Sequence, residues 1–291
     1  MTRIVCAGHV NWDITLQVDR LPETDGEARI TGQRQAGGGS ASNVAAVLAG
    51  LDAESTLIGS VGADEHGHLV RRELAALGVE TALVEVADAG TTVKYLVVDQ
   101  RGEVMILGNE GANEAFTVED LDTEAVECAD RLHLTSQRPE TAVMLAETAV
   151  EADVSVSFDP GRRIADRAYD PVVELAETVF LNEREAALVE GEGLLDSVET
   201  VVVKHGGDGA VVHRDGRTVS HPGFPVEPVD TSGAGDAFAA GFLAARDDRG
   251  IEGALAVGNV CGALAARTIG ARLYLSWDDV EAMLAVEEGP D

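Results

Sequence analysis

Residues 230–238 read DTSGAGDAF, a run of small residues that leads into a helical pattern of apolar residues over 233–246. Small residues let a backbone approach an anion closely, and the first N–H groups of a helix, at its positive end, lack partners within the helix. The amides of Gly233, Ala234 and Gly235 are therefore expected to form an anion hole. Asp236 follows them. Its carboxylate either stabilises the helix start as a favourable charge or accepts a proton, as phosphoryl transfer to an alcohol requires.

The sequence before this segment alternates between strand-like and helical stretches. Short apolar runs typical of buried strands occupy residues 3–8, 57–61, 131–134, 154–158, 178–181, 201–204 and 210–213. Helical periodicity covers residues 40–49, 69–77, 141–151, 183–189, 233–246 and 251–268. This alternation predicts an α/β fold whose central sheet is mostly parallel and covered by helices on both faces.

Two stretches, at about 12–36 and 88–110, interrupt the alternation and have the pattern of extended strands. The second is expected to form a hairpin, 92–98 with 103–107, that turns near Gln100, Arg101 and Gly102. We expect both stretches to pair into a small β-sheet over one edge of the main sheet, within one domain that covers residues 1–291.

Acidic residues dominate the charge, because 52 Asp and Glu against 21 Lys and Arg give a formal net charge of −31 over 291 residues. This charge repels nucleic acid and anionic lipid, and the sequence shows no basic patch. Lys94 and Lys204 are the only lysines. At about 1 M salt the Debye length is roughly 3 Å, so we interpret the composition as adaptation to high salt. An ordinary acidic enzyme is the alternative.

The sequence shows no sign of secretion or membrane insertion. The first residues, MTRIVCAGHVNWD, lack the apolar run of a signal peptide, and no segment has about 18 uninterrupted apolar residues. Cys6, Cys128 and Cys261 show neither disulfide nor zinc spacing, and the histidines are assigned no chemistry. We expect a cytoplasmic protein with neither a membrane nor a nucleic-acid partner.

Two motifs resemble the signatures of the ribokinase-like (PfkB) carbohydrate kinases. Residues 230–238 are similar to the C-terminal signature of that family, and residues 37–43 (GGGSASN) with 59–67 (GSVGADEHG) are similar to its N-terminal signature. The resemblance implies a ribokinase-like α/β fold with a small β-sheet lid. It also implies an enzyme that uses ATP and Mg²⁺ to phosphorylate a hydroxyl of a small sugar or sugar-like substrate.

The resemblance further implies roles for single residues. Asp236 matches the catalytic base, and Asp230 matches a monovalent-cation site, with K⁺ as one option. The residues implied to bind the sugar are Asn11, Asp13, Gly38, Gly39, Asn43 and Asn113. Asn182 and Glu185 match an Asn-x-x-Glu pair that helps to hold magnesium and phosphate, largely through water. The residues implied to contact ATP are Lys204, Gly206, Gly209 and Asn259.

Taken without the resemblance, several of these residues have plainer interpretations. Asn11 and Asp13 are a turn-forming pair, Gly206 and Gly209 serve a hairpin turn, and Glu185 is a solvated charge on a helix.

The chain departs from ribokinases in ways that bear on the substrate. Ser40 stands where ribokinases carry a lysine, and residues 135–137 (TSQ) stand where they place a sugar-binding glutamate, so strict ribokinase activity is not favoured. A nucleoside kinase of the same fold is the main alternative, and a non-catalytic nucleotide- or sugar-binding regulator is a weaker one. Arg138, Arg162 and Arg163 are interpreted as surface arginines, with binding of a carboxylate or phosphate as the alternative. A homodimer is an option.

Overall fold

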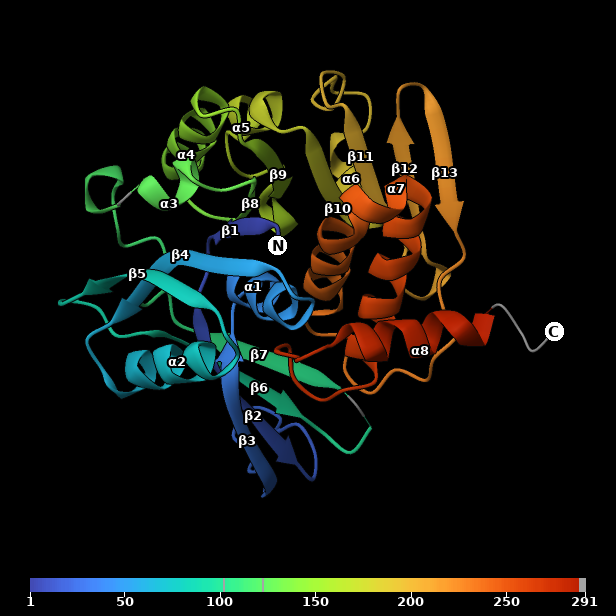
Figure 1. Cartoon of the computed structure of the whole chain (residues 1–291). Helices are drawn as coiled ribbons and strands as arrows, with labels where there is room; N and C mark the ends of the chain where they lie inside the picture. Colours follow the sequence, from blue (N-terminus) through green and yellow to red (C-terminus); the bar gives the residue numbers. More distant parts are fainter. Residues whose placement is uncertain (102, 122, 288–291) are drawn as a thin grey trace.

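The computed structural model describes residues 1–101, 103–121 and 123–287, and within them nine strands form the main sheet (Figure 1). The strand order is β13-β12-β11-β10-β9-β8-β1-β4-β5. The strands are β1 (Arg3–Ala7), β4 (Glu54–Gly62), β5 (Glu80–Val86), β8 (Arg131–Thr135), β9 (Ser155–Asp159), β10 (Thr178–Asn182), β11 (Thr200–Lys204), β12 (Ala210–Arg214) and β13 (Arg217–His221). Neighbouring strands from β5 to β11 are parallel, and β12 and β13 extend the sheet antiparallel, so the predicted mostly parallel sheet is confirmed.

Helices cover both faces of this sheet and enclose two apolar cores. The first core contains residues of α1 (Ser40–Gly50), α2 (Glu65–Ala76), α7 (Ala234–Ala266) and α8 (Trp277–Glu287). The second contains residues of α3 (Glu124–Glu127), α4 (Pro139–Glu151), α5 (Asp170–Leu175) and α6 (Glu183–Val189). Among the described residues, no helix has both the length and the apolar character needed to cross a membrane.

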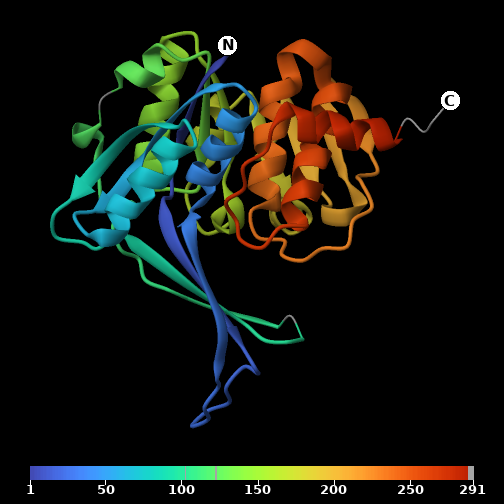
Figure 2. The ribbon, with the colours of Figure 1, turned by 60° about the horizontal axis from the view of Figure 1, so that its bottom comes forward.

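A second sheet in the order β3-β2-β6-β7 projects from the main body (Figure 2). Its strands are β2 (Asn11–Val18), β3 (Ile30–Gly38), β6 (Thr92–Val98) and β7 (Val104–Gly108). Both hairpins are antiparallel, while the central strands β2 and β6 pair in parallel. Asn11 pairs with both Gly38 and Thr92, so three strand ends meet where the small sheet joins the body. The small sheet is therefore confirmed, although Gly102 of the expected turn lies outside the described residues.

The structure differs from the predicted elements in several places, and the short helices α3 and α5 are among the elements that were not predicted. The helices predicted over 233–246 and 251–268 form one element, α7, which Gly250 kinks with a φ of 66°. Strands β5 and β13 were not predicted, because each is a partly exposed edge strand without a continuous apolar run. The acidic helix α8 was also missed, since its apolar residues are interspersed with charges.

We expect the folded state to become more stable as KCl rises from about 0.1 M to above 1 M, because the net charge of −31 is then screened over short distances. Thermal unfolding measured across a KCl series checks this. Sucrose at matched osmolality controls for stabilisation by solute exclusion. A melting temperature that stays constant or falls as KCl rises would contradict the adaptation to high salt.

Candidate active site

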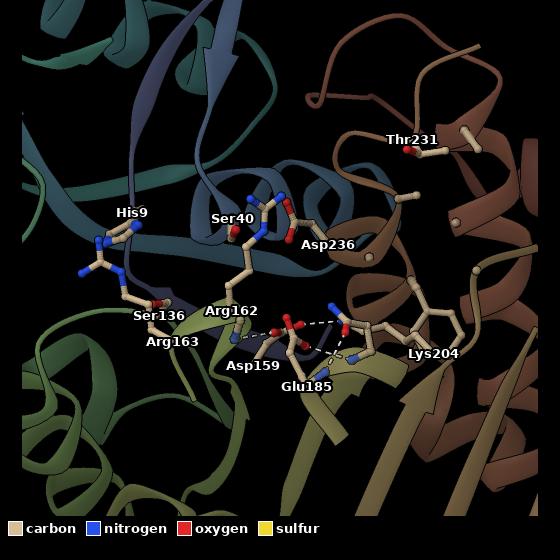
Figure 3. A pocket seen from close by; sticks show the side chains of 18 of the residues that line it. His9, Ser40, Ser136, Asp159, Arg162, Arg163, Glu185, Lys204, Thr231 and Asp236 are labelled. Carbon is tan, nitrogen blue, oxygen red and sulfur yellow. Dashed lines mark hydrogen bonds and ion pairs between the residues drawn. The ribbon is translucent and has the colours of Figure 1, made fainter. Parts of the chain in front are cut away.

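A cavity of about 1050 Å³ lies at the carboxyl edge of the parallel strands. His9, Ser136, Asp159, Asn182 and Lys204 line it, and they end or closely follow β1, β8, β9, β10 and β11 respectively (Figure 3). The carboxyl ends of parallel strands meet at one edge of a sheet, which is where α/β folds place their ligands. The predicted alternation of strands and helices is thus enough to bring these five residues together.

The N-terminus of α7 forms another part of the cavity wall. Ala234, Gly235 and Asp236 line the cavity, whereas Gly233 caps the helix with a φ of 75°. A Cβ atom at Gly233 would lie 2.3 Å from the carbonyl oxygen of Ala271, so this position requires glycine. Within the described residues, the amides of Gly235 and Asp236 have no hydrogen-bond partner, while the Ala234 amide donates to a preceding carbonyl at 3.3 Å. The free amides on the cavity wall are therefore those of residues 235 and 236.

Asp236 is held beside these amides by Asn43, whose Nδ2 donates to Oδ2 of Asp236 at 2.8 Å. Burial raises the pKa of Asp236 to about 6, and the negative charge of Asp159 adds to the shift. The hydrogen bond from Asn43 and the positive charge of Lys204 counteract it in part. A carboxylate of this kind is more basic than an ordinary aspartate and still mostly ionised at neutral pH.

Lys204 carries positive charge to the same place. Its Nζ lies 2.6 Å from Oδ2 of Asp159, and the two side chains are only 13% and 14% exposed. Burial opposes the charge on Lys204, but attraction to Asp159, with smaller contributions from Glu185 and Asp236, raises its pKa. A Cβ atom at Gly235 would lie 3.4 Å from Nζ of Lys204, so the ammonium group lies next to the free amides of α7.

Asn182 and Glu185 form a capping box at the start of α6. Oδ1 of Asn182 accepts from the Glu185 amide at 2.9 Å, and Oε2 of Glu185 accepts from the Asn182 amide at 2.8 Å. Glu185 is 5% exposed and lines the cavity, so the interpretation as a solvated helix charge is wrong. Burial, with repulsion from Asp159, raises its pKa.

The residues predicted to contact ATP all line the cavity. Gly206 and Gly209 have φ values of 59° and 87° in the loop between β11 and β12, a conformation that favours glycine. A Cβ atom at Gly209 would lie 1.9 Å from the carbonyl oxygen of His221, whereas one at Gly206 would meet nothing within 4 Å. Asn259, on α7, donates to the carbonyl oxygen of Leu255 at 2.8 Å.

The residues predicted to bind sugar lie mostly behind the cavity wall. Those absent from the described lining are Asn11, Asp13, Gly38, Gly39 and Asn43. Asn113 does line the cavity, and its Nδ2 donates to Oδ1 of Asn11 at 2.5 Å. The predicted sugar-binding residues include three buried polar atoms that lack a partner among the described residues: Nδ2 of Asn11, Oδ1 of Asp13 and Oδ1 of Asn43. Because buried polar atoms are normally paired, this group of orphaned atoms is suited to a hydroxyl-rich ligand.

An ion pair between buried Arg272 and partly exposed Glu73 of α2 lies at the junction between the small sheet and α1. Arg272 donates to the carbonyl oxygen of Gly38 at 3.2 Å and pairs with Glu73 at 3.2 Å. A Cβ atom at Gly38 would lie 2.1 Å from Oδ2 of Asp13, so this carboxylate packs directly against the junction. Burial raises the pKa of Asp13, while the charges of Lys94 and Arg272 counteract that shift.

Asp230 joins the two segments that flank α7. Its Oδ1 accepts from the Ser232 amide at 2.8 Å, and its Oδ2 accepts from the Gly270 amide at 2.9 Å. These bonds hold the loop that precedes the free amides. The monovalent-cation role of Asp230 stays a prediction.

Sequence reasoning missed several cavity residues. His9 was assigned no chemistry, and Lys94 was noted only as a rare lysine. Arg138, Arg162 and Arg163 were interpreted as surface arginines, and they are indeed exposed, but all five residues also line the cavity. For four of them, the sequence could have indicated a place in the cavity, because they lie within four residues of the carboxyl ends of β1, β8 and β9: His9, Arg138, Arg162 and Arg163. Lys94 had none, since it lies within β6 of the small sheet.

A comparison with protein families decides the assignment, because the pfkB family carbohydrate kinase model matches residues 1–278. The chain belongs to the pfkB family of carbohydrate kinases. The chain is also 54% identical over 292 residues to the ATP-dependent ribose-1-phosphate kinase of Halopiger xanaduensis, covering 98% of this chain and 99% of that protein. The prediction of an ATP-dependent carbohydrate kinase is thereby confirmed.

Two other relatives of this pfkB kinase bear on its fold and on the alternative substrate. The ribokinase of Thermotoga maritima has a solved structure that superposes with a TM-score of 0.88 at 25% identity, covering 98% of this chain and 100% of that one. The nucleoside kinase of Methanothermobacter thermautotrophicus is 28% identical over 253 residues, covering 83% of this chain and 82% of that protein. The ribokinase-like fold is therefore established, and the nucleoside-kinase alternative has relatives too.

Proposed function

We propose that this pfkB kinase transfers the γ-phosphoryl group of ATP to a free hydroxyl of ribose 1-phosphate. The observation that carries the proposal is the Asp236 carboxylate, with a pKa raised to about 6, beside free amides and Lys204 in one cavity. The substrate follows from the 54% identity, over nearly the full length of both chains, to a ribose-1-phosphate kinase.

The chemical step uses Asp236 as the proton acceptor. The substrate hydroxyl oxygen forms a bond to the γ-phosphorus, the bond from that phosphorus to the bridging oxygen of ADP breaks, and the hydroxyl proton passes to the Asp236 carboxylate. The amides of Gly235 and Asp236 donate to the oxygens of the migrating group, and the Lys204 ammonium adds positive charge there. We expect the exocyclic primary hydroxyl to react. The 1-phosphate keeps the ribose in its ring form, and this hydroxyl lies outside the ring, where it rotates freely.

Magnesium fits the carboxylates beside the phosphate region. Glu185 uses Oε2 in the capping box, which leaves its Oε1 free among the described residues. The negative charge of Asp159 repels the carboxylate of Glu185. A divalent cation near Glu185 would relieve that repulsion. The described residues contain no group of three His, Cys, Asp or Glu side chains that could hold a metal, which suits an ion held through water and phosphate oxygens. When bound, Mg²⁺ neutralises charge on the phosphoryl group.

The sugar hydroxyls would meet the orphaned polar atoms of Asn11, Asp13 and Asn43. Because these atoms lie behind the cavity wall, the sugar reaches them only when the small sheet shifts away from the body. The small sheet would then act as the lid, closing over the sugar through Asn11 and Asp13 of β2, with Asn113 on the cavity wall beside Asn11.

A coupled assay of ADP release in high KCl tests the proposal with ribose 1-phosphate, ribose and a set of nucleosides. We expect ribose 1-phosphate to give the highest kcat/KM and a product with two phosphate monoesters in the ³¹P spectrum. A higher kcat/KM with a nucleoside would replace the proposed substrate by the nucleoside alternative. A higher value with free ribose would remove the requirement for the 1-phosphate.

The proposed base also predicts a pH dependence. Protonation of Asp236 removes the proton acceptor, so kcat/KM should fall about tenfold per pH unit below about pH 6, the pKa to which burial raises this carboxyl. A profile of kcat/KM at constant KCl measures the acid limb. The residual activity of Asp236→Asn, followed over the same range, should lack that limb. A flat wild-type profile down to about pH 5 would argue against the assignment.

A further inference from the structure

Basic residues are concentrated in the cavity of this acidic protein. Among the described residues, six of the 21 Lys and Arg line the cavity, whereas only five of the 52 Asp and Glu do so. Basic residues thus outnumber acidic residues on the cavity wall, whereas acidic residues outnumber basic ones in the whole chain. This local excess of positive charge favours anionic ligands.

Two of the six cations are neutralised by partly buried carboxylates. Lys204 pairs with Asp159, and Arg167 makes two contacts of 3.0 Å with Glu114. The other four cations make no ion pair and no side-chain hydrogen bond within the described residues: Lys94, Arg138, Arg162 and Arg163. Unpaired arginines that line a cavity are suited to bind phosphate, because guanidinium groups match phosphate oxygens two at a time.

The side chains of the free arginines Arg162 and Arg163 extend in different directions. Figure 3 shows Arg162 extending toward Ser40 and Asp236, where the migrating phosphoryl group would lie. Arg163 diverges from Arg162 and ends beside His9, so its guanidinium group lies apart from the proposed base (Figure 3). Arg138 lines the same cavity from the N-cap position of α4.

The start of α4 adds to the positive potential near Arg138. This helix of 13 residues begins with Pro139, and no side chain caps its N-terminus. Within the described residues, the amides of Glu140 and Thr141 have no backbone partner. An uncapped helix N-terminus beside an unpaired arginine favours an anion for two independent reasons.

We propose that Arg138 and Arg163 bind the phosphate that the acceptor sugar already carries, and that this subsite makes the kinase specific for a sugar phosphate. The inference rests on the proposed function. A substrate that spans the cavity would place its 1-phosphate at Arg138 and Arg163 and its reacting hydroxyl at Asp236. Arg162 lies outside this subsite, because its side chain extends toward Ser40 and Asp236 instead (Figure 3).

Steady-state kinetics of Arg163→Gln and Arg138→Gln, at constant KCl, test the subsite. Each variant should raise KM for ribose 1-phosphate by about 10- to 100-fold, with a smaller change in kcat and an unchanged KM for ATP. Arg217→Gln, at an exposed arginine that does not line this cavity, is the matched control and should leave both KM values unchanged. Thermal melts confirm that each variant is folded.

Inorganic phosphate serves as a second probe that does not depend on turnover. It should inhibit the wild-type kinase competitively against ribose 1-phosphate, and calorimetry should detect its binding. Both effects should weaken at least tenfold in Arg163→Gln and stay unchanged in Arg217→Gln.

The outcomes separate the subsite from the proposed function. If the wild-type kinase does not phosphorylate ribose 1-phosphate, the proposed function fails. If it does, but both variants keep the wild-type KM and the wild-type affinity for inorganic phosphate, only the subsite is wrong. A raised KM for ATP with an unchanged KM for ribose 1-phosphate would assign the two arginines to the nucleotide and also overturn the inference.

Discussion

Asp236→Asn should lower kcat by about 10²- to 10⁴-fold while ATP still binds, because the amide keeps the size of the side chain but accepts no proton. The structure gives the physical basis for this expectation. Burial raises the pKa of Asp236 to about 6, and the free amides of residues 235 and 236 lie at the same helix start. Steady-state turnover and calorimetric titration of ATP measure the two quantities separately.

The alternative role of Asp236, a favourable charge at the start of α7, makes a different prediction. If Asp236 had only this role, Asp236→Asn would lose about 0.3 to 1 kcal/mol of folding free energy and keep near-normal turnover. Asp278→Asn is the matched control, because Asp278 lies in the first turn of α8, is exposed and does not line the cavity. A folded Asp236→Asn enzyme with a kcat close to that of the wild type would falsify the proposed mechanism.

The sheet and most of the cavity could be predicted from the sequence because both follow from local patterns. Alternating apolar runs and helical periodicity define a parallel sheet, and such a sheet fixes which residues share its carboxyl edge. Asp159, Asn182 and Lys204 meet for this reason, although they are distant in the chain. The capping box of Asn182 and Glu185 also had a local signal, since Asn followed three residues later by Glu is a typical helix start.

Side-chain direction and pairing could not be predicted in the same way. Arg162 and Arg163 are adjacent in the sequence, yet Arg162 extends toward Asp236 and Arg163 toward His9 (Figure 3). Arg167 lies four residues further and is neutralised by Glu114, a partner 53 positions away in the chain. Whether an arginine is free or paired depends on such distant contacts, so the sequence could not show that exposed Arg162 and Arg163 are free while Arg167 is paired.

The orphaned atoms behind the cavity wall also depend on tertiary structure. Asn11, Asp13 and Asn43 lie on β2 and α1, and only the folded chain shows that each buries a polar atom without a partner. The unpaired atoms therefore locate the proposed sugar site more closely than the N-terminal signature over residues 37–43 could. It also makes Asp13 the side chain on which a second large effect is expected.

Asp13→Ala should raise KM for ribose 1-phosphate about 5- to 150-fold, because an unmet polar partner in a closed site costs about 1 to 3 kcal/mol of binding free energy. Oδ1 of Asp13 is buried without a partner among the described residues, so a sugar hydroxyl that donates to it would satisfy an otherwise costly atom. KM for ATP should change little, since Asp13 belongs to the small sheet and does not line the cavity.

A structural role for Asp13 would give a different result, because its carboxylate also balances the buried charge of Arg272. If that were its only role, Asp13→Ala would lower the melting temperature and leave KM for ribose 1-phosphate unchanged at temperatures where the variant is folded. Thr15→Ala provides the control, since Thr15 lies two residues further along β2 on the same face and is half-buried. Equal losses in the affinity for ATP and for the sugar phosphate would show instead that the sugar site does not include Asp13, since Asp13 can discriminate between the two ligands only if it contacts one of them.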